Sequence, residues 1–237
     1  MKIDFDNIDF EQILHEIYEK ALNGVPKVSK PIPDLANDYL LKYKDSEKAS
    51  KELIKYQTIK CTTSGFLTSL GGLITLPVAI PANVGSVIYV QLRMISALAY
   101  IGGFDINSDQ VETMSYVCLT GSAAADILKS AGIKFGEKFT TNLIQKIPGK
   151  TLTAINQKVG FRFITKFGET GIINLGKAVP ILSGFIGGGI DLTSTKIIAN
   201  NAYNLFIKNE IPNNTKDELV IDVEINDEDE NDPYEKW

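Results

Sequence analysis

The chain has 237 residues, of which 44% are apolar and 22% are charged, and its formal net charge is −5. This composition is ordinary for a globular protein, and a mean hydropathy of 0.00 is too low for a multispanning membrane protein. The length allows one large domain or two small ones. Cys61 and Cys118 lie in apolar helical contexts, which indicates buried, reduced thiols in a cytoplasmic protein. The first twelve residues contain no apolar stretch, so we expect no secretory signal.

The net charge is distributed unevenly along the chain. Residues 216–237 hold ten acidic and two basic residues, whereas residues 129–177 hold nine basic and two acidic ones. A basic middle followed by an acidic tail favours an anionic partner surface, which the tail could shield.

The N-terminal part predicts three helices. Asp9 and Gln12 form a capping-box pattern before a helix over 10–22, and Asn23-Gly24 ends that helix. A proline-punctuated connector over 25–33 follows. Asp34 is then predicted to cap a short helix to about Lys44, and Ser46 to cap the next helix.

The middle of the chain contains 32 consecutive residues without a charge, 61–92. Glycines and prolines divide this region into two arms, and the second arm predicts a helix over 82–100 that Gly102-Gly103 ends. Asn107 or Ser108 is predicted to cap a further helix that runs to about Ser130.

Two basic amphipathic helices are predicted near 134–147 and 151–167, and a last helix over 181–208, ended by Pro212. Only residues 221–225 alternate with a period of two, which indicates an edge strand or a linear peptide, and the acidic run after them reads as disordered. The prediction is therefore an all-α protein, with a single helical domain over 1–210 and a flexible acidic tail over 211–237.

The apolar arms have three interpretations. Residues 61–92 and the second apolar stretch, 178–190, are a tightly packed helical core, a surface that inserts shallowly into a membrane or docks on one, or spanning segments. Small residues at the spacing of Gly184, Gly187 and Gly188 let helix backbones approach closely, which suits the first two interpretations.

The helix over 151–167 carries two stripes. One is apolar (Leu152, Ile155, Val159, Phe163), and the other is basic (Lys158, Arg162, Lys166). The basic stripe could hold anionic headgroups or could be a solvated rim beside a core-facing helix. Nucleic-acid binding is disfavoured because the chain has only two arginines and no recognised reader motif.

Catalytic and metal-binding signatures are missing from the sequence. His15 is the one histidine, and it cannot form a zinc site with the two cysteines at any standard spacing, so we expect a surface residue. Asp109 and Glu112 could bind a cation but suit the first turn of a helix, where carboxylates complement the dipole. No cofactor and no catalytic residue is predicted.

Arg93 is the one charge between Lys60 and Asp105. On an apolar helix it requires a partner, so it either forms an ion pair with Asp105, Asp126 or Asp191, or contacts a ligand or headgroup.

Two segments of the chain resemble the EcsC protein family. They are SGFLTSLGGLITLPVAIPANVGSVIYVQLRMISALAYIGGFD and KAVPILSGFIGGGIDLTSTKIIANNAYNLF, and the resemblance covers about residues 16–207. The positions that match the family's motifs are Gly71, Gly72, Pro77, Pro81, Arg93, Gly103, Asp105, Lys177, Pro180, Gly184, Gly187 and Gly188. The chain departs from the pattern at Ala79, where members often carry an acidic residue, and at Asp191, where they often carry asparagine.

The resemblance implies no settled enzymatic activity, and some family members are encoded with ABC transporter components. With the charge pattern, it predicts a non-enzymatic accessory protein that docks on the cytoplasmic membrane face or on an integral membrane partner. The candidate headgroup or ligand residues are Arg93, Lys158, Arg162, Lys166 and Lys177. The alternatives are a helical bundle that binds a lipid or a small apolar anion, and a hydrolase of unrecognised type.

Overall fold

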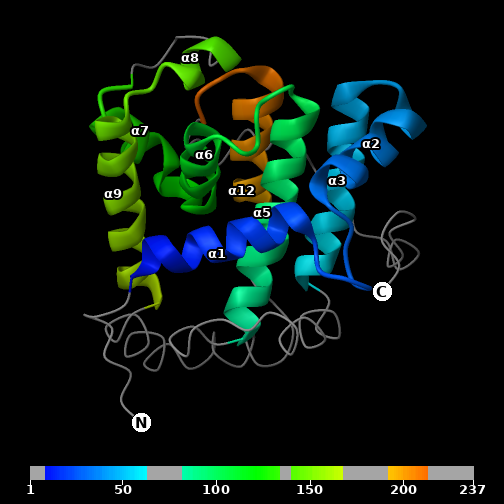
Figure 1. The fold of residues 1–237 in the computed structure, drawn as a ribbon, viewed down its shortest axis with the longest axis horizontal. Helices are drawn as coiled ribbons and strands as arrows, with labels where there is room; N and C mark the ends of the chain where they lie inside the picture. The colour runs from blue at the N-terminus through cyan, green and yellow to red at the C-terminus, as the bar shows by residue number, and fades with distance from the viewer. Residues whose placement is uncertain (1–8, 63–81, 134–139, 168–191, 213–237) are drawn as a thin grey trace.

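The computed structural model describes residues 9–62, 82–133, 140–167 and 192–212, and every regular element in these ranges is helical (Figure 1). The all-α prediction is confirmed. With the labels of Figure 1, the elements are α1 (Phe10–Asn23), α2 (Ile32–Tyr43), α3 (Ser46–Thr62), α5 (Ala82–Ile101), α6 (Asp109–Leu119), the 3₁₀ turn η2 (Gly121–Ala123), α7 (Ala124–Ser130), α8 (Thr141–Gln145), α9 (Gly149–Phe167), α12 (Leu192–Tyr203) and the π-helix η3 (Asn204–Lys208).

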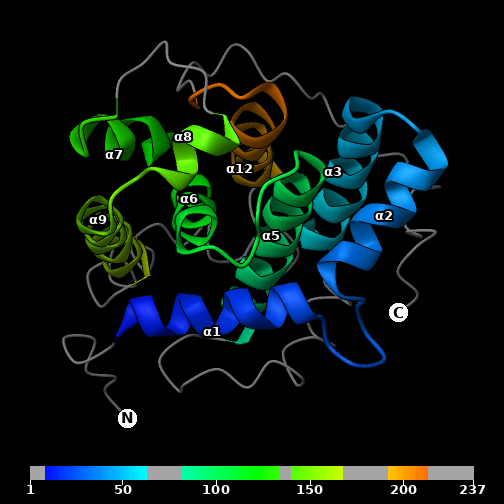
Figure 2. The same cartoon turned by 45° about the horizontal axis from the view of Figure 1, so that its top comes forward.

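Helix α5 is the centre of the fold. It packs against α1, α2, α3, α6 and α12, which surround it in both views (Figures 1 and 2). Its stretch Val84–Ile101 has the length and the mean hydropathy, 1.5, of a membrane-spanning helix, but 83% of that stretch is buried inside the protein. A helix that is apolar on every side needs neighbours on every side. For residues 84–101, the packed-core interpretation of the apolar arm therefore holds.

The predicted end of this helix at Gly102-Gly103 is confirmed. The amide of Phe104 donates to the carbonyl of Ala99, and the amide of Gly103 donates to the carbonyl of Tyr100. These two hydrogen bonds form a Schellman motif. Gly103 has a φ of 80°, in the left-handed region that glycine adopts without strain. Gly102 is needed for a different reason, because a Cβ there would lie 2.1 Å from the carbonyl oxygen of Phe206 in η3.

Helix α1 lies across α5 and beside the lower part of α9 (Figure 2). Its start and end follow the prediction, since the side chain of Asp9 accepts from the amide of Gln12 at 3.0 Å and Gly24 has a φ of 73°. The side chain of Gln12 donates to Glu16 instead of completing the capping box.

Two predicted helix starts are wrong by a short distance. Helix α2 begins two residues before Asp34, because Pro33 fits the first turn, where an amide hydrogen has no intrahelical acceptor. Asp34 lies within that turn. Helix α3 begins at Ser46, and the cap is Asp45, whose carboxylate accepts from the amide of Lys48 at 2.7 Å.

The helix predicted from Ser108 to Ser130 is interrupted. Ser108 caps α6 as expected, accepting from the amide of Val111. The helix then stops at Thr120, because Gly121 has a φ of 61° and turns the chain before α7. The last helix ends at Lys208, as predicted, but the residue that ends it is Asn209, with a φ of 57°, and not Pro212.

Helices α3 and α9 end, and α5 begins, on the same side of the protein, which is the lower side in Figure 1. These ends border the segments 63–81 and 168–191. The first apolar arm before α5, the Gly184–Gly188 cluster and the acidic tail after residue 212 lie outside the described residues. So do the first six residues, 134–139, of the helix predicted near 134–147, and the described remainder contains only the short helix α8.

Candidate functional site: a basic outer face on α9 and a cleft beside it

The apolar stripe predicted for α9 faces the core. Leu152, Ile155, Val159 and Phe163 are all buried, and α9 packs with this side against α1, α6 and α7. Of the two interpretations of α9, the buried stripe agrees with a core-facing helix that has a solvated rim. A membrane cannot take up the stripe, because the apolar surface is already in contact with other helices.

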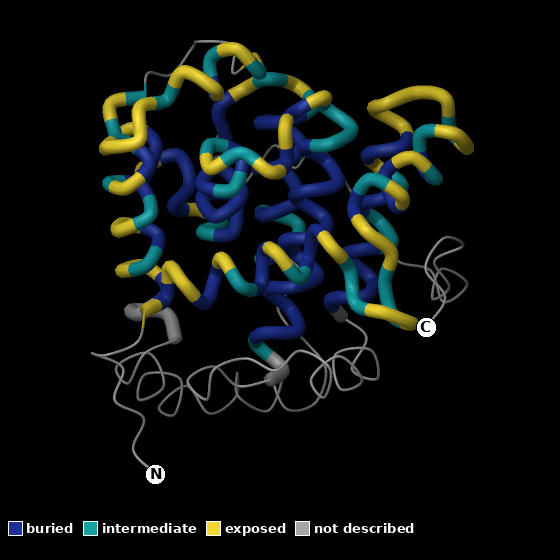
Figure 3. The backbone as a smooth tube through the Cα atoms, viewed as in Figure 1, coloured by how far each residue is buried: buried dark blue, intermediate teal, exposed yellow. Residues whose placement is uncertain are grey.

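The opposite side of α9 is exposed (Figure 3). Phe161, whose exposed fraction is 68%, and Lys150 lie on this side, and the exposed side chains of Lys158 and Arg162 lie on the flank between it and the buried stripe. The range 149–167 contains no acidic residue. Phe161 was not among the predicted site residues, although the helical repeat places it opposite Val159. We call these four residues the basic outer face.

Lys158 has a structural contact that the sequence did not indicate. Its Nζ donates to the carbonyl oxygen of Ser130 at 3.1 Å and to the hydroxyl of Ser130 at 2.6 Å. Ser130 is the last residue of α7, so the ammonium group lies where the helix dipole favours a cation. The side chain of Lys166, in the last turn of α9, and all of Lys177 lie outside the described residues.

Arg93 is inside the protein, with an exposed fraction of 1%. Its Nη1 donates to the carbonyl oxygen of Ala21 at 2.9 Å, and its guanidinium lies 5.8 Å from the ring centre of Tyr89. The prediction that Arg93 contacts a headgroup is wrong for this packing, because the membrane surface cannot reach a side chain buried between α1 and α5.

Asp105 was predicted as a partner for Arg93 and as a motif position. In the structure it shapes the turn before α6, where its carboxylate accepts from the amide of Asn107 at 3.1 Å and its carbonyl accepts from the hydroxyl of Ser108. Of the other motif positions, Gly103 lies in the Schellman motif. Those outside the described residues are Gly71, Gly72, Pro77, Pro81, Pro180, Gly184, Gly187 and Gly188.

A cleft of about 550 Å³ lies between α1, α6 and α9. We call it the α1–α6–α9 cleft. Its lining residues are Asp9, Glu11, Gln12, His15, Asp109, Glu112, Thr113, Tyr116, Gly149, Leu152, Thr153 and Asn156. The lining contains four carboxylates and no lysine or arginine, so the cleft has a negative potential.

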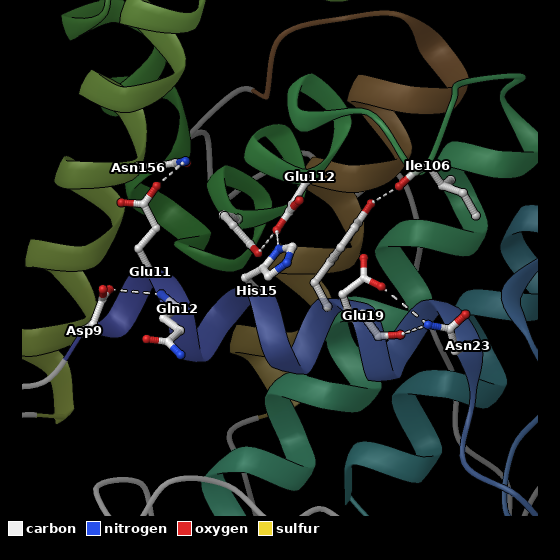
Figure 4. Close-up of polar contacts among 11 residues, drawn as sticks. Asp9, Glu11, Gln12, His15, Glu19, Asn23, Ile106, Glu112 and Asn156 are labelled. Carbon is white, nitrogen blue, oxygen red and sulfur yellow. Dashed lines mark hydrogen bonds and ion pairs between the residues drawn. The ribbon is translucent and has the colours of Figure 1, made fainter.

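Two side-chain contacts cross this cleft (Figure 4). His15 Nδ1 lies 2.7 Å from Glu112 Oε1, joining α1 to α6, and Asn156 Nδ2 donates to Glu11 Oε1 at 3.0 Å, joining α9 to α1. The hydroxyl of Tyr116 donates to the same oxygen of Glu112. Glu112, which was predicted to complement the helix dipole, therefore also bonds His15 and Tyr116.

Burial and neighbouring charges shift the pKa values of His15 and Tyr116. The hydrogen bond to Glu112 raises the pKa of His15 above 6.5, against the lowering effect of partial burial, and the charges of Glu112, Glu19 and Asp109 add to the increase. Burial is the largest reason why the pKa of Tyr116 is raised, with the nearby carboxylate as the second. Tyr116 thus remains a neutral donor at physiological pH, and His15 is the group that changes charge near neutrality.

His15 was expected to be a surface residue, and its side chain is 56% exposed. The pairing with Glu112, 97 positions away, was not predictable from local sequence. Within the described ranges, no group of three or more His, Cys, Asp or Glu residues is placed to hold a metal ion. Cys61 and Cys118 are buried and reduced.

Comparisons with protein-family models, with curated proteins and with solved structures find no match to this chain. The resemblance to the EcsC family therefore stays a prediction from the quoted residues.

Proposed function

We propose that this protein docks peripherally on an anionic membrane surface through the basic outer face of α9. The observation that carries the proposal is a large aromatic side chain, Phe161, exposed among three basic residues on a helix without any acidic residue. Aromatic rings and long basic side chains are the groups that favour the membrane–water interface.

The expected binding is weak and reversible. Each lysine or arginine near an anionic surface contributes about 1 kcal/mol, which gives about 2 kcal/mol for Lys150 and Arg162, because the ammonium of Lys158 is already bonded to Ser130. Transfer of the exposed part of Phe161 into the interface adds about 1–2 kcal/mol. The binding should fall as salt screens the charges.

The packing of the helices favours surface docking over insertion. Helix α5 and the apolar stripe of α9 are both buried against other helices. Inserting either into a membrane would remove it from these contacts, and the burial of this apolar surface stabilises the fold. The resemblance to EcsC sequences, some of which are encoded with transporter components, supports the same location and an integral membrane protein as a further partner.

Flotation with phosphatidylcholine vesicles, with and without phosphatidylserine, tests the proposal at low and high salt. We expect binding to the anionic vesicles only, weakened by salt, and about tenfold weaker in Phe161→Ala. The matched control is Leu41→Ala, because Leu41 is 75% exposed on α2, at the opposite end of the protein from α9 (Figure 2).

A second pair of variants separates this face from net charge. Lys150→Gln/Arg162→Gln should reduce binding, whereas Lys48→Gln/Lys51→Gln, which makes the same charge change on α3, should not. Equal losses in both pairs, or no vesicle binding by the native protein, would overturn the proposal.

A further inference from the structure

The N-terminal half of α1 is tied to the rest of the protein by polar side chains. His15 pairs with Glu112 on α6 at 2.7 Å, and Glu11, one turn earlier, accepts from Asn156 on α9 at 3.0 Å. Further along α1, the contacts are more apolar, with Tyr18 edge-on against Tyr116 and its buried hydroxyl donating to the carbonyl of Ile106. Of these contacts, only the one between His15 and Glu112 contains a group, the imidazole, that titrates near neutral pH.

The charged groups around His15 all favour its protonated form. Helix α6 presents Glu112 and Asp109, together with the phenol of Tyr116, which stays neutral. Helix α1 itself contributes Glu11 and Glu19, and its N-cap residue Asp9 lines the same cleft.

The remaining helices that pack on α1 add little near His15. The α9 wall contributes Gly149, Leu152, Thr153 and Asn156, and none of these titrates. Arg93 on α5 meets α1 at the carbonyl of Ala21, further along the helix.

We infer that the His15–Glu112 contact is a pH-sensitive latch that holds the N-terminal half of α1 against α6 and α9. Below the raised pKa of His15 the contact is an ion pair, in which an imidazolium donates to a carboxylate. Above that pKa it is a hydrogen bond from a neutral ring, in a cleft whose other charges are all negative. This inference is independent of the proposed membrane docking.

The sign of the effect follows from the raised pKa of His15. A base whose pKa is higher in the folded state stabilises that state fully below its unfolded value, here 6.5, and loses this contribution as the pH rises through the folded value. The latch is therefore tighter in mildly acidic solution and looser in mildly alkaline solution.

Proton NMR of the native protein tests the first part of the inference, because the chain has a single histidine and its ring signals need no assignment. We expect His15 to titrate above 6.5 in the native protein and closer to 6.5 in Glu112→Gln, which keeps the size of the side chain and removes its charge. A native value at or below 6.5, or the same value in the variant, would overturn the inference.

Amide hydrogen exchange, corrected for the intrinsic effect of pH, tests the second part. Between about pH 6 and pH 8, the protection of the α1 amides should fall about two- to fivefold in the native protein, as expected for an exposed ion pair. The amides of α3 serve as the internal control, and in His15→Gln the protection of α1 should not depend on pH. If α1 and α3 change alike, or if His15→Gln behaves as the native protein does, the latch does not exist.

Discussion

Gly102→Ala is the sharpest test of how the C-terminal π-helix packs on the central helix. The added Cβ would lie 2.1 Å from the carbonyl oxygen of Phe206 and 3.0 Å from its carbonyl carbon. Contacts of a Cβ below 3.0 Å essentially do not occur, so η3 and the end of α5 must separate by about 1 Å. That movement would also lengthen the neighbouring edge-to-face contact between Phe104 and Phe206, whose ring centres are 5.2 Å apart.

The cost of the substitution follows from this geometry. Overpacking in a core costs about 1–3 kcal/mol, and the upper end applies here because the obstacle is backbone and cannot rotate away. A loss of about 3 kcal/mol lowers the Tm of a protein of this size by about 6–12 °C. Urea unfolding followed by circular dichroism, together with a thermal scan, measures both quantities.

Two other glycines provide matched controls for the same substitution. Gly160→Ala, in α9, meets no atom within 4 Å, so it should stabilise the protein by about 0.5–1 kcal/mol through helix propensity. Gly103→Ala also has free space, but its φ of 80° makes it cost about 1–2 kcal/mol. If Gly102→Ala costs no more than Gly103→Ala, η3 does not pack on α5 as described.

Three further predictions concern the core and the surface. Gln57→Met should stabilise the protein by about 1 kcal/mol in urea unfolding, because the amide of Gln57 is buried and neither of its polar atoms has a hydrogen-bond partner among the described residues. Cys61 and Cys118 should not react with a thiol reagent in the native protein but should react fully in denaturant, since burial raises the pKa of Cys61 to about 12 and that of Cys118 as well. Lys208→Met should lose stability relative to the native protein above about pH 4.5, and the difference should vanish as acid titrates Glu47, whose pKa the hydrogen bond from Lys208 lowers; a difference that persists in acid would contradict this reasoning.

The helix boundaries were predictable where a single local interaction decides them. The carboxylate of Asp9, the hydroxyl of Ser108 and the left-handed conformations of Gly24 and Gly103 act on neighbouring residues, so the sequence contains the whole cause. The prediction was wrong where two local signals compete. An example is Pro33, which extends the start of α2 beyond Asp34.

The residues of the candidate site were predictable in part. The periodicity of α9 correctly separated its buried stripe from its basic residues, because a helix presents residues three and four apart on the same side. It could not show that Lys158 reaches Ser130 or that Arg93 lies against Ala21. Those contacts depend on how α9 packs beside α7, and α5 beside α1.

By itself, the sequence determined the helical class, most of the helix ends and the two-sided character of α9. These properties arise from interactions that span only a few residues. Only the tertiary structure decided that the apolar helical stretch over 84–101 is the core of the protein, that Phe161 is left in solvent, and that His15 meets Glu112 across a cleft. An apolar helix has the same sequence pattern whether lipid or protein covers it, and a contact between residues 97 positions apart exists only after the helices have packed.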